Sequence, residues 1–203
     1  MDAPPEHITL ADVGAVLRRW RWPADLDNVH RAIEDSREHL RPFMPWADQS
    51  VEGTAQFLAK TDEQWRAGTD YTYAIVDATT GRVLGGCGLH TRRGPGVLEI
   101  GYWLRADATG RGLATAAAGA LTDAATAVDG VERVEIWCDE GNADSAAIPR
   151  RLGYRLDRME EVPGEAPGGT GRHMVWVFPA GHATKAPRSE VVATQGDQGE
   201  PPV

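Results

Sequence analysis

The segment 107–115, which reads DATGRGLAT, has the clearest chemical character in the chain. It follows an apolar strand pattern and opens an alanine-rich helix pattern, so free backbone amides and the positive end of a helix dipole should converge there. Gly110 and Gly112 let the backbone approach an anion, while Arg111 and Thr115 can add ionic and hydroxyl contacts. The segment predicts a phosphate site, with a tight turn that only leads into a helix as the alternative.

Two common phosphate motifs are absent from this segment. Thr115 occupies the position of the third glycine of a dinucleotide fingerprint, and no Gly-Lys-Ser/Thr follows the loop. Neither NAD nor ATP is therefore implied.

Glu99 is a carboxylate inside the otherwise apolar stretch 97–104. If it faces a cleft, burial raises its pKa and makes it a candidate general base that acts through a bridging water. The alternatives are an exposed edge carboxylate and a structural ion pair.

Other reactive side chains carry weaker signals. Cys138 has no histidine nearby in sequence, so we expect a buried, inert thiol. His90 ends a strand pattern, and an imidazole can accept a proton, which allows an auxiliary base or a substrate contact. The six histidines lack close ligand pairing, so no metal site is expected.

The whole-chain composition narrows the class of protein. A length of 203 residues fits one domain, and 21 Lys plus Arg against 30 Asp plus Glu give a net charge of -9. This acidity argues against nucleic acid as a partner and suits a cationic substrate, although it can also serve solubility alone. Two cysteines and the absence of a basic-then-apolar leader or a run of about 18 apolar residues predict a cytoplasmic protein without a membrane segment.

The periodicity of apolar residues predicts the elements that position these groups. Strand patterns cover 8–10, 15–20, 71–75, 82–90, 97–104, 131–136, 154–159 and 174–178, and helix patterns cover 26–40, 57–68, 113–128 and 145–152. This order predicts a mixed sheet flanked by helices, in one domain over 1–180. The polar remainder, 181–203, is predicted to be a disordered tail.

Several motifs occur in an order that resembles a known superfamily. Strand, Gly-x-Gly-x-Ala-Thr at 110–115, helix, strand, Asn142-x-x-Ser145 and the Arg-Leu-Gly-Tyr of 151–154 resemble the GNAT acetyltransferases. The segments 40–46, 88–90 and 99–104 resemble the RimJ/RimL-type branch, which acetylates protein N-termini among other amines. The resemblance covers roughly 8–178.

The resemblance implies an α/β (α+β) fold with a mostly antiparallel twisted sheet, in which a splayed central strand pair forms the acetyl-CoA cleft. Acetyl-CoA is then the co-substrate, with its pyrophosphate on the glycine-loop amides and its pantetheine along the strand ending at Leu104. Asn142 would contact the pantetheine arm, and Ser145 would protonate the departing thiolate or, alternatively, cap its helix. The expected cofactor-binding residues are Trp103, Leu104, Arg105, Gly110, Arg111, Gly112, Ala114, Thr115 and Asn142.

The chain also departs from the superfamily pattern. Asp107 stands where many members carry Gln or Arg, so we expect binding by amides and the helix terminus, with Arg105 or Arg111 as a replacement cation. Pro149 and Arg150 occupy the stretch in which many relatives carry a tyrosine general acid.

The segment 43–46 is the best candidate for the acceptor side, because prolines pre-order its aromatic residues; core packing is the alternative. Together with the cleft it gives the expected substrate-binding residues Phe43, Trp46, His90 and Tyr102. The sequence thus predicts direct transfer of acetyl from acetyl-CoA to a primary amine, in first place a protein or peptide N-terminal α-amine. A small amine such as an antibiotic, polyamine or amino acid is the alternative, and a non-catalytic acyl-CoA sensor is the alternative from another class. The protein is expected to be a monomer or a homodimer.

Overall fold

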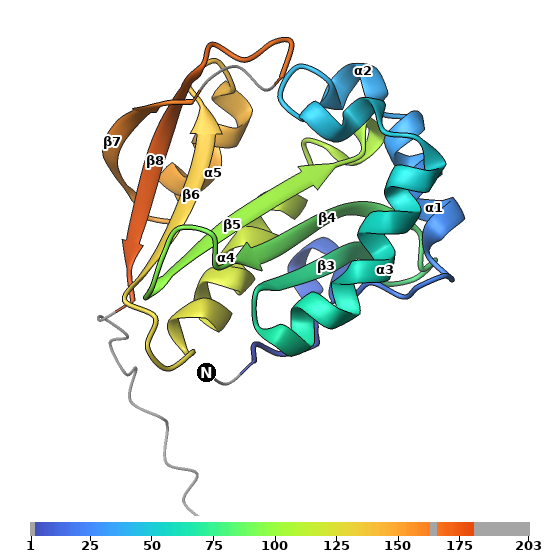
Figure 1. The fold of residues 1–203 in the computed structure, drawn as a ribbon, viewed down its shortest axis with the longest axis horizontal. Coiled ribbons are helices and arrows are strands. Elements are labelled where there is room, and N and C mark those ends of the chain that lie inside the picture. The colour runs from blue at the N-terminus through green and yellow to red at the C-terminus, as the bar shows by residue number, and fades with distance from the viewer. Residues whose placement is uncertain (1–2, 163–165, 181–203) are drawn as a thin grey trace, which may run out of the picture.

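A computed structural model describes residues 3–162 and 166–180. They form an eight-stranded sheet in the order β1-β2-β3-β4-β5-β6-β8-β7, flanked by helices (Figure 1). The strands are β1 (His7–Leu10), β2 (Ala15–Arg19), β3 (Asp70–Asp77), β4 (Val83–His90), β5 (Val97–Leu104), β6 (Arg133–Asp139), β7 (Arg155–Glu161) and β8 (Arg172–Pro179). The α-helices are α1 (Leu26–Glu34), α2 (Arg37–Leu40), α3 (Val51–Ala67), α4 (Leu113–Thr126) and α5 (Ala143–Arg151).

The strand pairs are antiparallel except for β5 and β6, which run parallel because α4 connects them. The predicted mixed, mostly antiparallel sheet flanked by helices is therefore confirmed.

A hydrophobic core lies on each face of the sheet. Alanine-rich α4 has high helix propensity and packs Leu113 and Leu121 against Leu98 and Ile100 of β5. On the other face, α1 places Val29 and Ile33 over β4, and α3 places Leu58 over β3. The two faces of β5 therefore contact different layers.

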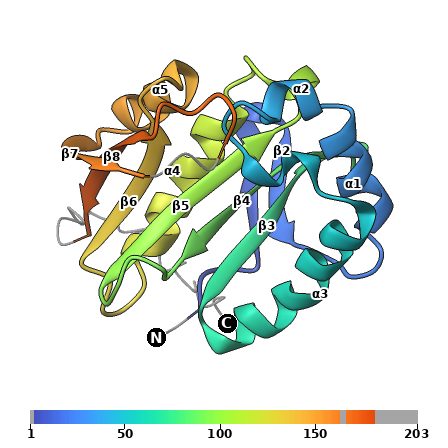
Figure 2. The same cartoon turned by 45° about the horizontal axis from the view of Figure 1, so that its top comes forward.

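The central strand pair diverges part-way along its length. β5 and β6 pair only from Val97 opposite Arg133 to Ile100 opposite Ile136, although both strands continue beyond that point. Figures 1 and 2 show the two ribbons separating toward the end where β5 leads into α4. From Gly101 to Leu104, β5 pairs with β4 alone, so its other backbone edge has no strand partner among the residues that the structure describes. The predicted splayed strand pair is present.

The helix predicted over 26–40 is interrupted, and here the prediction is wrong. α1 ends at Glu34 and α2 begins at Arg37. Ser36 Oγ accepts a hydrogen bond from the Ala106 amide at 3.1 Å, and Asp35 pairs with Arg105 at 3.1 Å. Both contacts join this turn to the end of β5, which explains why the apolar periodicity does not continue as one helix.

Two further predictions concern the tail and a membrane segment. The tail predicted for 181–203 lies outside them. No helix within 3–162 and 166–180 is long and apolar enough to cross a membrane.

Replacing Leu121 by alanine tests the role of the α4 core. Leu121 is fully buried, so the change should lower the free energy of unfolding by about 2–5 kcal/mol. Leu156→Ala is the matched control because Leu156 is 42% exposed, and it should stay within about 0.5 kcal/mol of wild type. Urea unfolding of both variants measures the difference, and equal losses would contradict the assignment of the core.

Candidate active site

The glycine loop ends in the uncapped first turn of α4. Gly110 and Gly112 adopt the left-handed conformation with φ of 73° and 78°, which favours glycine. Gly112 is the N-cap of α4 and, as a glycine, provides no side-chain cap for the first turn. Ala114 and Thr115 lie half-buried in that turn, and Arg111 is exposed beside it. The loop can therefore present amides and one cation to an anion.

The acid at Asp107 has its own basic partners. Arg82 donates to Oδ2 at 2.6 Å, and Arg105 donates to Oδ1 at 3.0 Å. The hydrogen bonds from Arg105 and Arg82 lower the pKa of Asp107 to about 2. Arg105 also pairs with Asp35, so two carboxylates neutralise its charge. Of the two predicted replacement cations, Arg111 is the better placed for a phosphate.

The last residues of β5 point to opposite faces. Leu104 packs against the core under α4. Trp103 lies on the α1 side, where its ring meets Trp46 edge-on with centroids 5.6 Å apart. The Trp103 side chain thus contacts the predicted acceptor loop, and its backbone carbonyl lies toward β4, against the place that a Cβ on Gly85 would take.

Ser145 and Asn142 have separate tasks at the start of α5. Asn142 Oδ1 accepts a hydrogen bond from the Ser145 amide at 3.0 Å and so caps the helix. The Ser145 hydroxyl instead lies 3.1 Å from the Tyr102 hydroxyl. Ser145 is therefore not the cap, and its hydroxyl connects α5 to β5 beyond the last β5–β6 pair.

Tyr102 and Cys138 are both held in their protonated forms. Burial raises the pKa of the Tyr102 phenol, although its hydrogen bond with Ser145 opposes the shift. Burial likewise raises the pKa of the Cys138 thiol, as expected for an inert cysteine. The paired hydroxyls of Tyr102 and Ser145 can therefore donate a proton. The sequence patterns did not show that these two residues are in contact.

Glu99 is buried but does not have the raised pKa expected from the sequence. Arg92 donates to Oε2 from Nε at 3.0 Å and contacts Oε1, and Arg93 also binds Oε2. Burial raises the pKa of this carboxyl, but the hydrogen bonds and charges of the two arginines outweigh it and hold the pKa below its ordinary value. Its contacts are those of the structural ion pair considered as an alternative. Whether Glu99 also takes part in catalysis stays a prediction.

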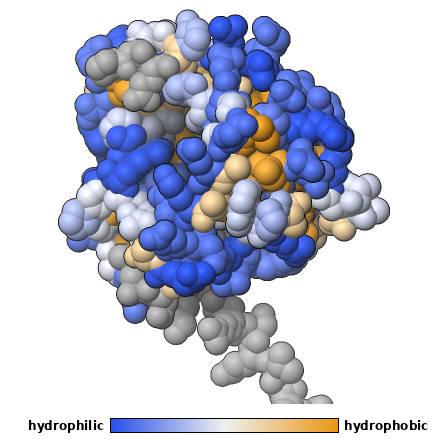
Figure 3. All heavy atoms as spheres, turned by 45° about the vertical axis from the view of Figure 1, so that its right-hand side comes forward, coloured by the Kyte–Doolittle hydropathy of each residue, from blue (hydrophilic) through white to orange (hydrophobic). Residues whose placement is uncertain are grey.

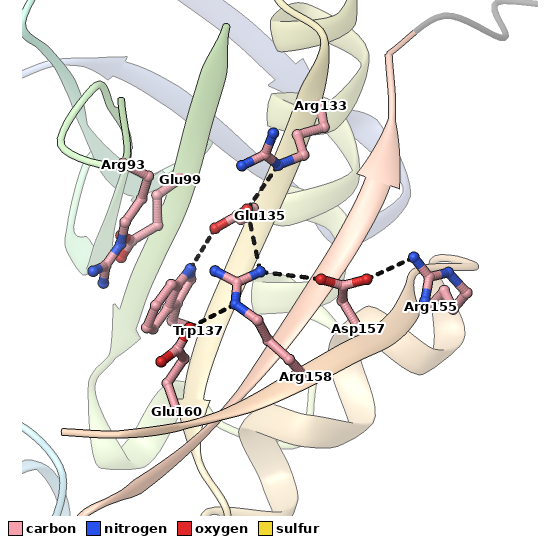
Figure 4. Close-up of polar contacts among 9 residues, drawn as sticks. All are labelled: Arg93, Glu99, Arg133, Glu135, Trp137, Arg155, Asp157, Arg158 and Glu160. Carbon is pink, nitrogen blue, oxygen red and sulfur yellow. Dashed lines mark hydrogen bonds and ion pairs between the residues drawn. The ribbon is translucent and has the colours of Figure 1, made fainter. Parts of the chain in front are cut away.

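A network of charged side chains continues from Glu99 across β6 and β7 (Figure 4). The Arg93 guanidinium stacks 3.6 Å from the centroid of the Trp137 ring. Trp137 Nε1 and Arg133 Nε donate to buried Glu135 at 2.7 and 2.8 Å. These contacts hold the turn that connects β4 and β5 against β6. They lie near the part of the sheet in which β5 and β6 still pair. The network continues through Arg158, Asp157, Arg155 and Glu160.

His90 lies on the same face of the sheet as Glu99 and directly opposite it in the β4–β5 register. Its Nδ1 contacts Asp70 Oδ1. Sequence reasoning missed Asp70 because only the β3–β4 register, which pairs Asp70 with His90, brings them together.

The predicted acceptor loop reaches across the opening. Phe43 Cε1 lies 4.0 Å from the place that a Cβ on Gly141, just after β6, would take. The Gly168 amide donates to Pro42 O at 2.9 Å, and the Thr170 amide donates to Asp139 at the end of β6 at 2.7 Å. Figure 2 shows the coloured segment that leads into β8 extending toward α2. Phe43 and Trp46 therefore stand at the rim between β5 and β6.

The side of the molecule formed by α1 and α3 is mostly hydrophilic with a small apolar patch (Figure 3). Exposed large hydrophobic side chains in and beside these helices are Trp22, Val51 and Phe57. Within the described residues, no group of three or more His, Cys, Asp or Glu side chains could hold a metal ion.

The decisive comparison is with protein families. A family model described as an acetyltransferase (GNAT) domain matches residues 15–155. The chain belongs to the GNAT acetyltransferase family. The match runs from the first residue of β2 to the first residue of β7, so it includes the divergent strands, the glycine loop and all of α5.

Solved structures show the same fold as this GNAT chain. The microcin C7 self-immunity acetyltransferase MccE, in complex with acetyl-CoA and AMP, aligns with a TM-score of 0.77 at 18% identity over 86% of this chain and 97% of its own. RimL, an acetyltransferase of ribosomal L7/L12 in complex with coenzyme A, gives 0.75 at 18% identity over 86% and 98%. Mycobacterium smegmatis RimJ in complex with CoA-disulfide gives 0.76 at 21% identity over 88% and 90%. No curated protein matches the chain in sequence at a significant level.

Gly112→Val tests the anion site. Both the new side chain and the strained φ should disturb the amides, so affinity for acetyl-CoA should fall about tenfold or more. Gly130→Val is the matched control because Gly130 has a similar φ of 83° in the turn after α4, with open space around an added Cβ. Each variant should lose about 1–2 kcal/mol of stability. Calorimetry that finds equal affinity in the two variants would contradict the site.

Ser145→Ala separates proton donation from helix capping. The cap uses the Ser145 amide, so the variant should keep its thermal stability while turnover falls about a hundredfold. Asn142→Ala removes the helix cap, so this variant should lose about 1 kcal/mol of stability. Unchanged turnover in Ser145→Ala would exclude the hydroxyl as proton donor.

Proposed function

We propose that this GNAT enzyme transfers an acetyl group from acetyl-CoA to a primary amine. The observation that carries the proposal is the divergence of β5 and β6 after Ile100, next to the uncapped amides of α4. Two features favour a long ligand with a phosphate group: a free strand edge and an anion-binding helix terminus. The complexes of MccE with acetyl-CoA and of RimL with coenzyme A support this choice.

The residues that would hold acetyl-CoA come from three elements. Amides of Gly110, Gly112, Ala114 and Thr115, with Arg111, would bind the pyrophosphate. On the free edge of β5 the backbone at Leu104, next to Trp103, would pair with the pantetheine, and Asn142 would contact it from the start of α5. Arg105 would act indirectly, since it holds Asp107 and Asp35 away from the phosphates.

Direct transfer in a ternary complex fits the groups around the opening. The amine attacks the thioester carbonyl, the N–C bond forms, and the C–S bond breaks. Ser145, in contact with Tyr102, would donate a proton to the departing thiolate. The buried Cys138 thiol, whose pKa is raised, is a poor nucleophile, so no covalent enzyme intermediate is needed.

For the acceptor, we favour a protein or peptide N-terminal α-amine. Solved structures of the same fold include RimL and a ribosomal-protein-S5-alanine acetyltransferase from Vibrio fischeri, which supports a protein substrate. Phe43 and Trp46 at the rim offer aromatic surface to a peptide's first side chains. The second candidate is a small amine, and the observation that favours it is the likeness to MccE, a microcin C7 self-immunity acetyltransferase whose structure holds the small molecule AMP beside acetyl-CoA.

A substrate screen decides between these acceptors. Release of free coenzyme A thiol is measured with acetyl-CoA and two panels, one of short peptides with free N-termini and one of small amines. Each peptide is paired with the same sequence blocked at its N-terminus. We expect the free peptides to be acetylated, with the added mass on the α-amine, and the blocked peptides to be inert. Turnover of small amines alone would replace the peptide proposal with the alternative.

A further inference from the structure

The proton acceptor for the incoming ammonium group is the unassigned role in this site. Glu99 is buried between Arg92 and Arg93, which stabilise its ionised form and make it a weak base. A second carboxylate, Asp70, lies on the same face two strands away. In the register, Asp70 is opposite His90, and His90 is opposite Glu99.

Asp70 fixes the orientation of the His90 ring. Its Oδ1 contacts His90 Nδ1, and its Oδ2 accepts a hydrogen bond from Gln64 of α3 at 3.2 Å. A carboxylate on Nδ1 places the ring proton there and leaves the lone pair of the neutral imidazole on Nε2. The anchored carboxylate therefore favours the tautomer that can accept a proton at Nε2.

Two glycines make room for the opposite side of this ring. A Cβ on Gly88 would lie 3.2 Å from His90 Nε2, and a Cβ on Gly101 would lie 3.3 Å from the same atom. Nε2 thus sits over the β4–β5 ladder at Gly101, the first residue of β5 beyond its last pair with β6. The His90 side chain is 18% exposed, so the ring is held but still open to solvent.

Thr72 is a further polar residue on this face of the sheet. It is opposite Gly88 on β3 and is only 7% exposed. Its methyl carbon Cγ2 lies 3.1 Å from the place that a Cβ on Gly88 would take, and its Oγ1 has no hydrogen-bond partner among the described residues. A buried unpaired hydroxyl is costly, so a bound polar group or a water within reach of Oγ1 would give it a partner.

We propose that His90 Nε2 accepts a proton from the acceptor's ammonium group, with Asp70 as its positioning residue. This inference rests on the proposed acetyltransferase function. The proton leaves nitrogen for Nε2 and passes to solvent after the reaction. The neutral amine then forms the N–C bond as the C–S bond breaks. The nitrogen then loses a second proton, and the departing thiolate gains one. The Ser145 hydroxyl can relay this transfer. Overall, the reaction therefore releases one proton to solvent.

The test uses His90→Ala and His90→Gln in the full-length protein. Turnover of the best amine from the screen should fall about a hundredfold in both, with acetyl-CoA affinity by calorimetry unchanged. Added imidazole should restore turnover in His90→Ala, because a small base can take the vacated place. Asp70→Asn should lose less turnover than His90→Ala. His30→Ala is the matched control, since His30 is a half-buried histidine on α1 bonded to Thr54, and it should keep wild-type turnover.

Three results would overturn the assignment. Wild-type turnover in both His90 variants excludes the base, and a loss in both that imidazole leaves unchanged makes the residue structural. A hundredfold loss in Glu99→Gln beside wild-type turnover in the His90 variants assigns the proton to Glu99 instead. If the wild-type protein acetylates no amine at all, the proposed function itself fails, which is distinct from failure of the His90 assignment.

Discussion

The early end of the β5–β6 pairing is the constraint on which the rest of the site depends. Four residue pairs join the strands, and beyond Ile100 and Ile136 they no longer pair with each other: β5 keeps only β4 as its partner, and β6 keeps only β8. Backbone groups of β5 that would otherwise bond β6 remain free for a ligand that runs along the edge. The same divergence lets Tyr102 reach Ser145 on α5 and gives the glycine loop its position at the end of β5.

The ionic contacts around this opening determine which polar groups are available. Asp107 and Asp35 neutralise Arg105, and Arg92 and Arg93 neutralise Glu99. The arginines lower the pKa of Asp107 and of Glu99, so both carboxylates stay ionised and are weak bases. What remains for chemistry is a set of less charged groups: the Ser145 and Tyr102 hydroxyls on one face of β5 and the imidazole of His90 on the other.

The sequence predicted the features that depend on local pattern. The bounds of β5 follow from the apolar run 97–104, and the glycine loop before α4 follows from Gly110 and Gly112. Features that depend on distant partners were wrong or missed. The break at Asp35 and Ser36 needs Arg105 and Ala106, about seventy residues away along the chain, as its partners. The lowered pKa of Glu99 likewise needs the turn geometry that brings Arg92 and Arg93 onto one carboxylate.

Binding of acetyl-CoA to the wild-type protein tests the central claim most directly. Titration calorimetry should detect saturable binding at one site per chain, because the free β5 edge and the α4 terminus together form one site. Absence of saturable binding would contradict the account, since the divergent strands would then hold no coenzyme.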